Sequence, residues 1–158
     1  MIQETINRLD HLLKILPPLL NAVPEQEFKI KPRPEKWSRQ EILGHLIDSA
    51  TNNHQRFVRF QFEEDLKIVY DQDNWVKYNH YNELSKEHVI KFWTLYNTHL
   101  LEIIKLIPEE NLKRTGITNS KVTLGWLIND YVIHLEYHMK QIVDFPTKVT
   151  KYPADQDK

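Results

Sequence analysis

The sequence predicts an all-α fold, a four-helix bundle with a long crossover connection between its second and third helices. Apolar residues recur at helical spacing in four long segments, no segment shows strand-like alternation, and only three of the 158 residues are glycines. Amphipathic helices without a sheet bury their apolar faces against one another. Residues 1–150 are predicted to form this single domain, and residues 151–158 a short polar C-terminal tail.

The first two helices are expected near residues 2–22 and 38–61. Leucines and isoleucines at helical spacing mark the first helix. Pro17 and Pro18 fall inside it and are expected to kink or end it, because proline removes a helix hydrogen bond. The second helix begins with a capping box that starts at Ser38, which fixes its first turn sharply.

The third and fourth helices are expected near residues 85–107 and 124–143. Ser85 is the candidate N-cap of the third helix, and Pro108 is expected to stop that helix or to open a short extra turn. The fourth helix is expected to start after Thr123 and carries an apolar stripe along its whole length.

The connection between the second and third helices, residues 63–84, is too long for a tight antiparallel turn. Its aromatic residues are Tyr70, Trp75, Tyr78 and Tyr81. A disordered linker would not hold so many aromatics. The segment is therefore expected to pack as a crossover at the rim of a pocket, and whether it acts as a lid is left open.

Composition excludes several classes of protein. The net charge is −1, and the basic run at residues 28–40 is broken by prolines, so it is interpreted as a solvated connector. Nucleic-acid binding through residues 29–39 is the weaker interpretation and would require strong salt dependence. Charged residues interrupt the apolar residues at the N-terminus, so neither a signal peptide nor a membrane span is predicted there. The sequence therefore predicts a cytoplasmic protein without a membrane partner, and the net charge predicts no nucleic-acid partner.

The absence of cysteine leaves histidine and carboxylate as the metal-binding chemistry. His134 and His138 stand four residues apart in VIHLEYHMKQI, so they share one face of the fourth helix. His45, beside the apolar stripe of the second helix, is the best candidate for a third ligand. Spacing and phase leave two interpretations open, a three-histidine metal site or histidines that are only hydrogen-bonded or solvated.

Two familiar metal motifs do not match this helix. The zinc-protease motif places Glu directly after the first His, whereas Glu136 lies about 200° around the helix from His134. Glu136 is therefore expected to face solvent or another helix. The di-iron carboxylate bundle requires two Glu-x-x-His elements, and the sequence has none.

Three short motifs together resemble a known family. They are Lys36-Trp37-Ser38, His45-Leu46, and the pair His134 and His138 followed by Gln141-Ile142. Residues 36–57 and 123–142 resemble the DinB-like superfamily, especially its YfiT-like members. The order of the motifs, their separation and the long connection between the second and third helices also match that family. The resemblance covers nearly the whole chain.

This resemblance implies a bundle that holds a divalent metal on His45, His134 and His138. Three imidazoles suit zinc or nickel, with iron or manganese as alternatives, and three protein ligands leave one coordination position open. Such a metal activates water at neutral pH, or holds a low-molecular-weight thiol as thiolate. The implied function is a metal-dependent hydrolase, or a thiol S-transferase that uses bacillithiol or a similar thiol, acting on a small molecule.

The sequence departs from the thiol-transferase branch at one place. That branch carries further histidines between the last two ligands, where this chain has Leu135, Glu136 and Tyr137. This departure weakens the inference that the chain shares that branch's substrate. It weakens the inference of a metal site less.

Asp130, one turn before His134, is the candidate for a residue that orients a ligand histidine or acts as a base, and a solvated aspartate is the alternative. The competing hypothesis is a non-catalytic bundle that binds a small ligand or partner and whose metal is structural or absent. Its ground is that no general base or nucleophile other than Asp130 is evident in the sequence. Relatives look dimeric, and the apolar faces of the first and third helices would allow a homodimer.

Overall fold

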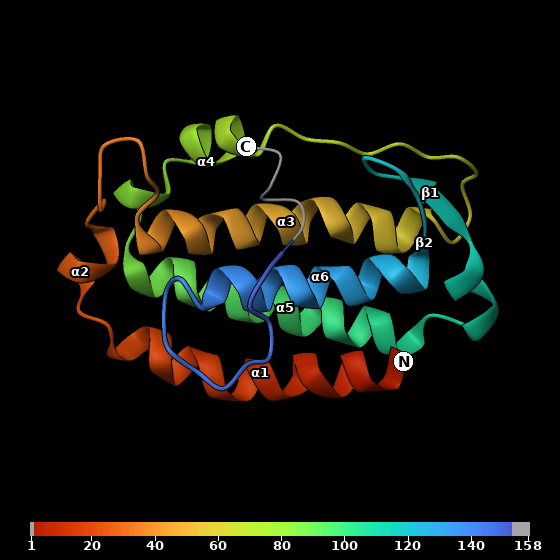
Figure 1. Cartoon of the computed structure of the whole chain (residues 1–158), viewed down its shortest axis with the longest axis horizontal. Coiled ribbons are helices and arrows are strands. Elements are labelled where there is room, and N and C mark those ends of the chain that lie inside the picture. The colour runs from red at the N-terminus through yellow and green to blue at the C-terminus, as the bar shows by residue number, and fades with distance from the viewer. Residues whose placement is uncertain (1, 153–158) are drawn as a thin grey trace.

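Four long helices build the molecule, as predicted: α1 (Ile2–Ala22), α3 (Arg39–Arg59), α5 (Lys86–Leu106) and α6 (Leu124–Met139). The computed structural model describes residues 2–152. Figure 1 shows α3 and α5 running in one direction and α1 and α6 in the other. α3 and α1 each pack against both α5 and α6, so the four apolar faces close on a single core. The all-α class and the bundle are therefore confirmed.

The predicted helix starts are confirmed by their caps. Ser38 accepts a hydrogen bond from the Glu41 backbone N–H (3.1 Å), and Glu41 Oε2 accepts one from the Ser38 backbone N–H (2.8 Å). Ser85 and Thr123 cap α5 and α6 through their hydroxyl oxygens. These caps satisfy N–H groups that lack a partner within their own helix.

Pro17 and Pro18 do not end α1, which continues to Ala22. A proline inside a helix costs about 3 kcal/mol. Leu16 and Leu20 lie on the buried face on either side of the two prolines, and burying such side chains contributes about 1.5–3 kcal/mol each. Packing of this last turn against the core therefore outweighs the lost hydrogen bonds.

The expectation that the chain contains no strands is wrong. A two-stranded antiparallel sheet joins β1 (Thr115–Ile117) and β2 (Lys121–Thr123), with Thr115 opposite Thr123. Each strand has only three residues, too few to show the alternation that identifies a strand. Gly116 is required in β1 because a Cβ at this position would overlap the ring of Phe60.

Four short helices complete the fold. They are α2 (Glu25–Lys29), α4 (Gln72–Asn79), and the 3₁₀ turns η1 (Tyr81–Glu83) and η2 (Glu109–Lys113). The last of these is the extra turn expected after Pro108. α6 ends at Met139, earlier than predicted, and a turn continues the chain to Val143. No helix within residues 2–152 has the length and apolar character needed to cross a membrane.

The connection 63–84 returns along the bundle and carries α4 and η1 (Figure 1). Tyr81 of η1 is buried over α3, where a Cβ at Gly44 would overlap its ring. Gly44 thus admits an aromatic ring of the connection rather than a neighbouring helix. The Tyr81 hydroxyl donates to Asp48 Oδ1 (2.5 Å), and Asn79 Nδ2 donates to the same oxygen (3.1 Å).

Asp48 gives the stability of the protein a predicted pH dependence. Burial raises the pKa of this carboxyl from its ordinary value of 3.8 to about 7. Between these values the unfolded chain releases the proton that the folded chain keeps, so the free energy of unfolding falls as the pH rises from about 4 to about 7. Asp48→Asn retains the Oδ1 acceptor and cannot ionise. Relative to the wild type, we expect this variant to gain up to about 4 kcal/mol of stability at pH 8 but only about 1 kcal/mol at pH 4.5.

Urea unfolding at the two pH values measures this difference, with Asp144→Asn, at an exposed carboxylate, as the matched control. A variant that is destabilised equally at both pH values would contradict the prediction, because it would show a hydrogen-bonding role without a buried charge.

Candidate metal centre

Three histidines from two helices converge where the first part of α3 lies beside the last turns of α6. His45 comes from α3, and His134 and His138 come from successive turns of α6. His45 Nε2 lies 3.2 Å from His134 Nε2, and one nitrogen of each of the three rings lies within 4.8 Å of the others. The structure therefore brings together the three residues that the sequence singled out, and their role as metal ligands stays a prediction.

The spacing of these nitrogens fits a divalent ion. Ligands 2.0–2.1 Å from a tetrahedral zinc lie roughly 3.3 Å from one another, close to the separation of the His45 and His134 nitrogens. The His138 ring is oriented by Gln141, whose Oε1 lies 3.1 Å from Nδ1. With Nδ1 as the donor in this hydrogen bond, Nε2 is the nitrogen that a metal ion would use. An all-imidazole donor set suits zinc and nickel.

Burial isolates the cluster on one side and leaves it open on the other. His45 and His138 are buried, whereas His134 is half-buried. The indole of Trp37 lies against the His45 ring, with 5.0 Å between their centroids. Trp37 is thus part of the wall around His45.

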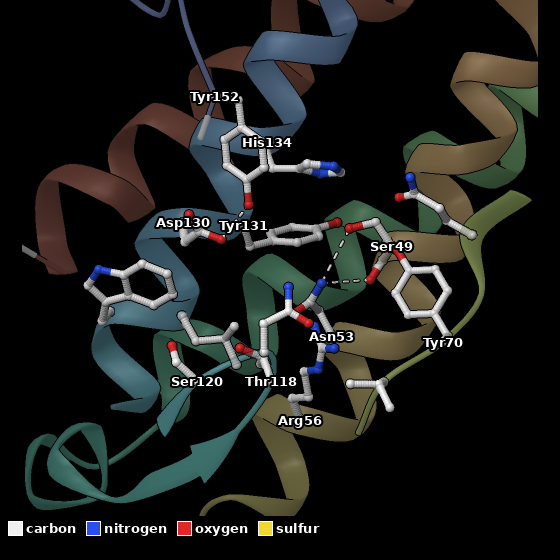
Figure 2. Close-up of a pocket in the computed structure, with 15 residues that line it drawn as sticks. Ser49, Asn53, Arg56, Tyr70, Thr118, Ser120, Asp130, Tyr131, His134 and Tyr152 are labelled. Carbon is white, nitrogen blue, oxygen red and sulfur yellow. Dashed lines mark hydrogen bonds between the residues drawn. The ribbon is translucent and has the colours of Figure 1, made fainter. Parts of the chain in front are cut away.

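His134 also lines a pocket of about 360 Å³ beside the cluster. Figure 2 shows this pocket between α3 and α6, closed at one end by the turn that joins β1 to β2. Its polar lining includes Ser49, Asn53, Arg56, Asp130 and Tyr152. Val69 and Tyr70 of the connection 63–84 also line it. A small molecule in this pocket would lie directly beside His134.

Asp130 lies in this pocket, but its hydrogen bond joins it to a tyrosine. Its Oδ2 accepts from the Tyr152 hydroxyl (2.7 Å) (Figure 2). Burial raises the pKa of the Asp130 carboxyl, while the Tyr152 hydrogen bond and the charge of Arg56 act in the opposite direction. Both roles predicted for Asp130, orienting a ligand histidine and acting as a base, stay predictions.

Tyr152 is the residue of the site that sequence reasoning missed. It falls in the segment 151–158 that was expected to be a polar tail, yet its ring centroid lies 5.0 Å from that of His134. The only signal in the sequence is an aromatic residue among polar ones. Residues 153–158 lie outside the described residues.

Of the three residues between the two α6 histidines, Leu135 and Glu136 face away from the cluster, whereas the Tyr137 ring centroid lies 5.1 Å from that of His138. Glu136 forms a salt bridge with Arg8 of α1 at 2.7 Å, which confirms that it points to another helix. Leu135 is buried in the core. Thus neither the zinc-protease arrangement nor a carboxylate-bridged metal pair is built here.

Comparisons with known proteins agree with this architecture. A curated protein of Oceanobacillus iheyensis, provisionally named a metal-dependent hydrolase, is 22% identical over 144 residues, which are 89% of this chain and 83% of that protein. The structure of YfiT from Bacillus subtilis, described as a probable metal-dependent hydrolase with an unusual four-helix bundle topology, superposes with a TM-score of 0.80. It is 19% identical, over 89% of this chain and 83% of YfiT.

A second solved structure extends the comparison to thiol chemistry. A point variant of a mycothiol-dependent maleylpyruvate isomerase superposes with a TM-score of 0.78 and 11% identity, over 95% of this chain and 65% of the isomerase. At these identities both structures show the shared fold alone. The family model of the DinB superfamily matches residues 4–142. Since that match spans most of the sequence, the chain belongs to the DinB superfamily.

Proposed function

We propose that this protein is a metal-dependent enzyme that holds a divalent ion, zinc or nickel, on His45, His134 and His138 and acts on a small molecule. The observation that carries the proposal is the convergence of three imidazole nitrogens at the edge of a pocket. Structural metal sites use four protein ligands, whereas three leave a position for a reactant. When bound, the ion would supply the Lewis acidity that makes water or a low-molecular-weight thiol nucleophilic near pH 7.

The chain's own residues supply position and proton transfer. Gln141 holds the His138 ring, and Trp37 packs against the His45 ring. Asp130 and Tyr152 share a hydrogen bond in the pocket wall. Because burial raises the pKa of Asp130, this carboxylate is a stronger base than an exposed one and is suited to accept the proton that a nucleophile loses.

The two candidate reactions, hydrolysis and thiol transfer, differ in their need for a thiol. The mycothiol-dependent neighbour supports thiol transfer, and the provisional names of the other two relatives support hydrolysis. The same geometry accommodates both, because the position beside His134 accepts either water or a thiol.

The test uses the purified protein loaded with zinc or with nickel. Consumption of monochlorobimane in the presence of bacillithiol, and hydrolysis of p-nitrophenyl acetate in its absence, are each followed before and after removal of the metal. We expect one of the two rates to depend on the metal. If metal removal lowers the melting temperature while neither rate exceeds that of the metal-free protein, the competing hypothesis of a non-catalytic bundle is supported instead.

A further inference from the structure

Arg56 is a buried cation in the wall of the pocket beside His134. It is only 8% exposed, and Figure 2 shows its side chain reaching from α3 toward Asn53. Nη1 donates to Asn53 Oδ1 (3.2 Å) and Nη2 donates to the carbonyl oxygen of Ile68 (2.6 Å). A guanidinium has five N–H donors, so these two bonds fix its orientation and leave capacity for further acceptors.

This guanidinium is under-satisfied in the described part of the chain. Its Nε is buried without a hydrogen-bond partner there. No salt bridge described within residues 2–152 includes Arg56. Asp130 acts on Arg56 only through its charge at longer range, and its carboxylate is already bonded to Tyr152. A buried cation without a counter-charge is costly unless an anion completes it.

We propose that Arg56 binds a carboxylate of the molecule that occupies this pocket, so that the substrate class is a small carboxylic acid. The planar guanidinium matches a carboxylate through paired hydrogen bonds. A phosphate is less favoured, because no lysine is among the lining residues within 2–152. The aromatic lining formed by Tyr70, Trp126 and Tyr131 fits an apolar or aromatic body attached to that carboxylate.

This inference rests on the proposed function only in taking the pocket as the place where reactants bind. With the carboxylate on Arg56, the remainder of the molecule extends toward His134, which lines the same pocket. The carboxylate belongs either to the molecule that is attacked or to the thiol that attacks it. Binding measurements separate these two sources without requiring turnover.

The experiment compares matched acids and amides by isothermal titration calorimetry on the zinc-loaded protein. 3-Phenylpropanoate and 3-phenylpropanamide represent the attacked molecule, and N-acetylcysteine and its amide represent the thiol. Arg56→Met removes the charge at similar volume, and Arg56→Lys keeps the charge but not the planar fork. Arg59→Gln, on the same helix but outside the pocket lining, is the matched control.

In the wild type we expect at least one acid to bind about tenfold or more tightly than its amide, as charge-assisted paired hydrogen bonds predict. That preference should fall below about threefold in Arg56→Met, be reduced in Arg56→Lys, and persist in Arg59→Gln. The pair that shows the effect identifies the source of the carboxylate. Equal binding of acid and amide in the wild type, or an unchanged preference in both Arg56 variants, overturns the proposal.

Repeating the titration with His138→Ala separates this inference from the metal chemistry. A preference for the acid that persists in His138→Ala and disappears in Arg56→Met supports the Arg56 site even if no metal-dependent reaction is found. If the preference disappears in His138→Ala and is unchanged in the folded Arg56 variants, the metal binds the carboxylate, and the assignment to Arg56 is wrong.

Discussion

His138→Ala is expected to lower the affinity of the protein for zinc by on the order of 100-fold or more. Loss of groups that merely orient a ligand already lowers metal affinity by about 10–100-fold, and this substitution removes a ligand itself. The wild-type geometry supplies three nitrogens within 4.8 Å of one another, and the variant retains only two. Competition for zinc against a chromogenic chelator measures the change.

Gln141→Ala tests the orientation of the same ring more finely. Its Oε1 holds His138 Nδ1 at 3.1 Å, so its removal frees the ring to rotate without removing a ligand. We expect zinc affinity to fall by about tenfold in this variant, an intermediate result between wild type and His138→Ala.

Thermal unfolding provides an independent measure of metal binding. An ion that binds only the folded state at 100 times its dissociation constant stabilises that state by about 2.7 kcal/mol. Zinc should therefore raise the melting temperature of the wild type and of His11→Ala, a substitution at an exposed histidine of α1, but not that of His138→Ala. Equal zinc content in the wild type and in the His45→Ala/His138→Ala double variant would remove the metal site from the proposal.

Helices could be predicted from this sequence because their signals are local. The capping box at Ser38 and the spacing of apolar residues in α3 and α6 each lie within a few turns of chain, and they fix which faces are buried. The hairpin formed by β1 and β2 depends instead on the close approach of Gly116 to Phe60, far away in sequence. A strand of three residues contains no sequence signal that predicts such a contact.

The candidate site divides in the same way. The relation of His134 to His138 follows from helix geometry, and helix phase placed His45 beside the apolar stripe of the second helix. Tyr152 reaches the cluster through an irregular segment after α6. Such a segment has no helical or strand periodicity from which the direction of a side chain could be predicted. Periodicity therefore predicts what a helix presents, but not what an irregular segment brings to it.

Glu136→Ala is expected to destabilise the fold by about 2–4 kcal/mol while leaving the metal site nearly intact, because breaking a buried ion pair costs several kcal/mol. Glu136 is 5% exposed, and both of its oxygens accept from Arg8, at 2.9 Å and 2.7 Å. The Thr147 hydroxyl also donates to Oε2 (2.6 Å). This carboxylate thus joins α1 to α6 and to the segment that leads toward Tyr152.

The partner substitution should be more damaging. Arg8→Ala leaves the Glu136 carboxylate buried without its counter-charge, whereas Glu136→Ala leaves a guanidinium whose side chain is already 31% exposed to water. A double-mutant cycle in urea measures the coupling between the two residues, which we expect to exceed about 1 kcal/mol. Glu102→Ala, which breaks an exposed pair with Lys105, is the matched control and should change stability by less than about 0.5 kcal/mol.

Measuring zinc affinity in the same variants separates a structural role of Glu136 from a chemical one. Glu136 lies between two candidate ligands in sequence but about 200° around the helix from His134, so its loss should change zinc affinity by less than about threefold. The opposite pattern, unchanged stability with zinc binding lost, would require the Glu136 carboxylate to act at the metal. The bidentate contact with Arg8 argues against that pattern, because both oxygens are already committed to holding α1 against α6.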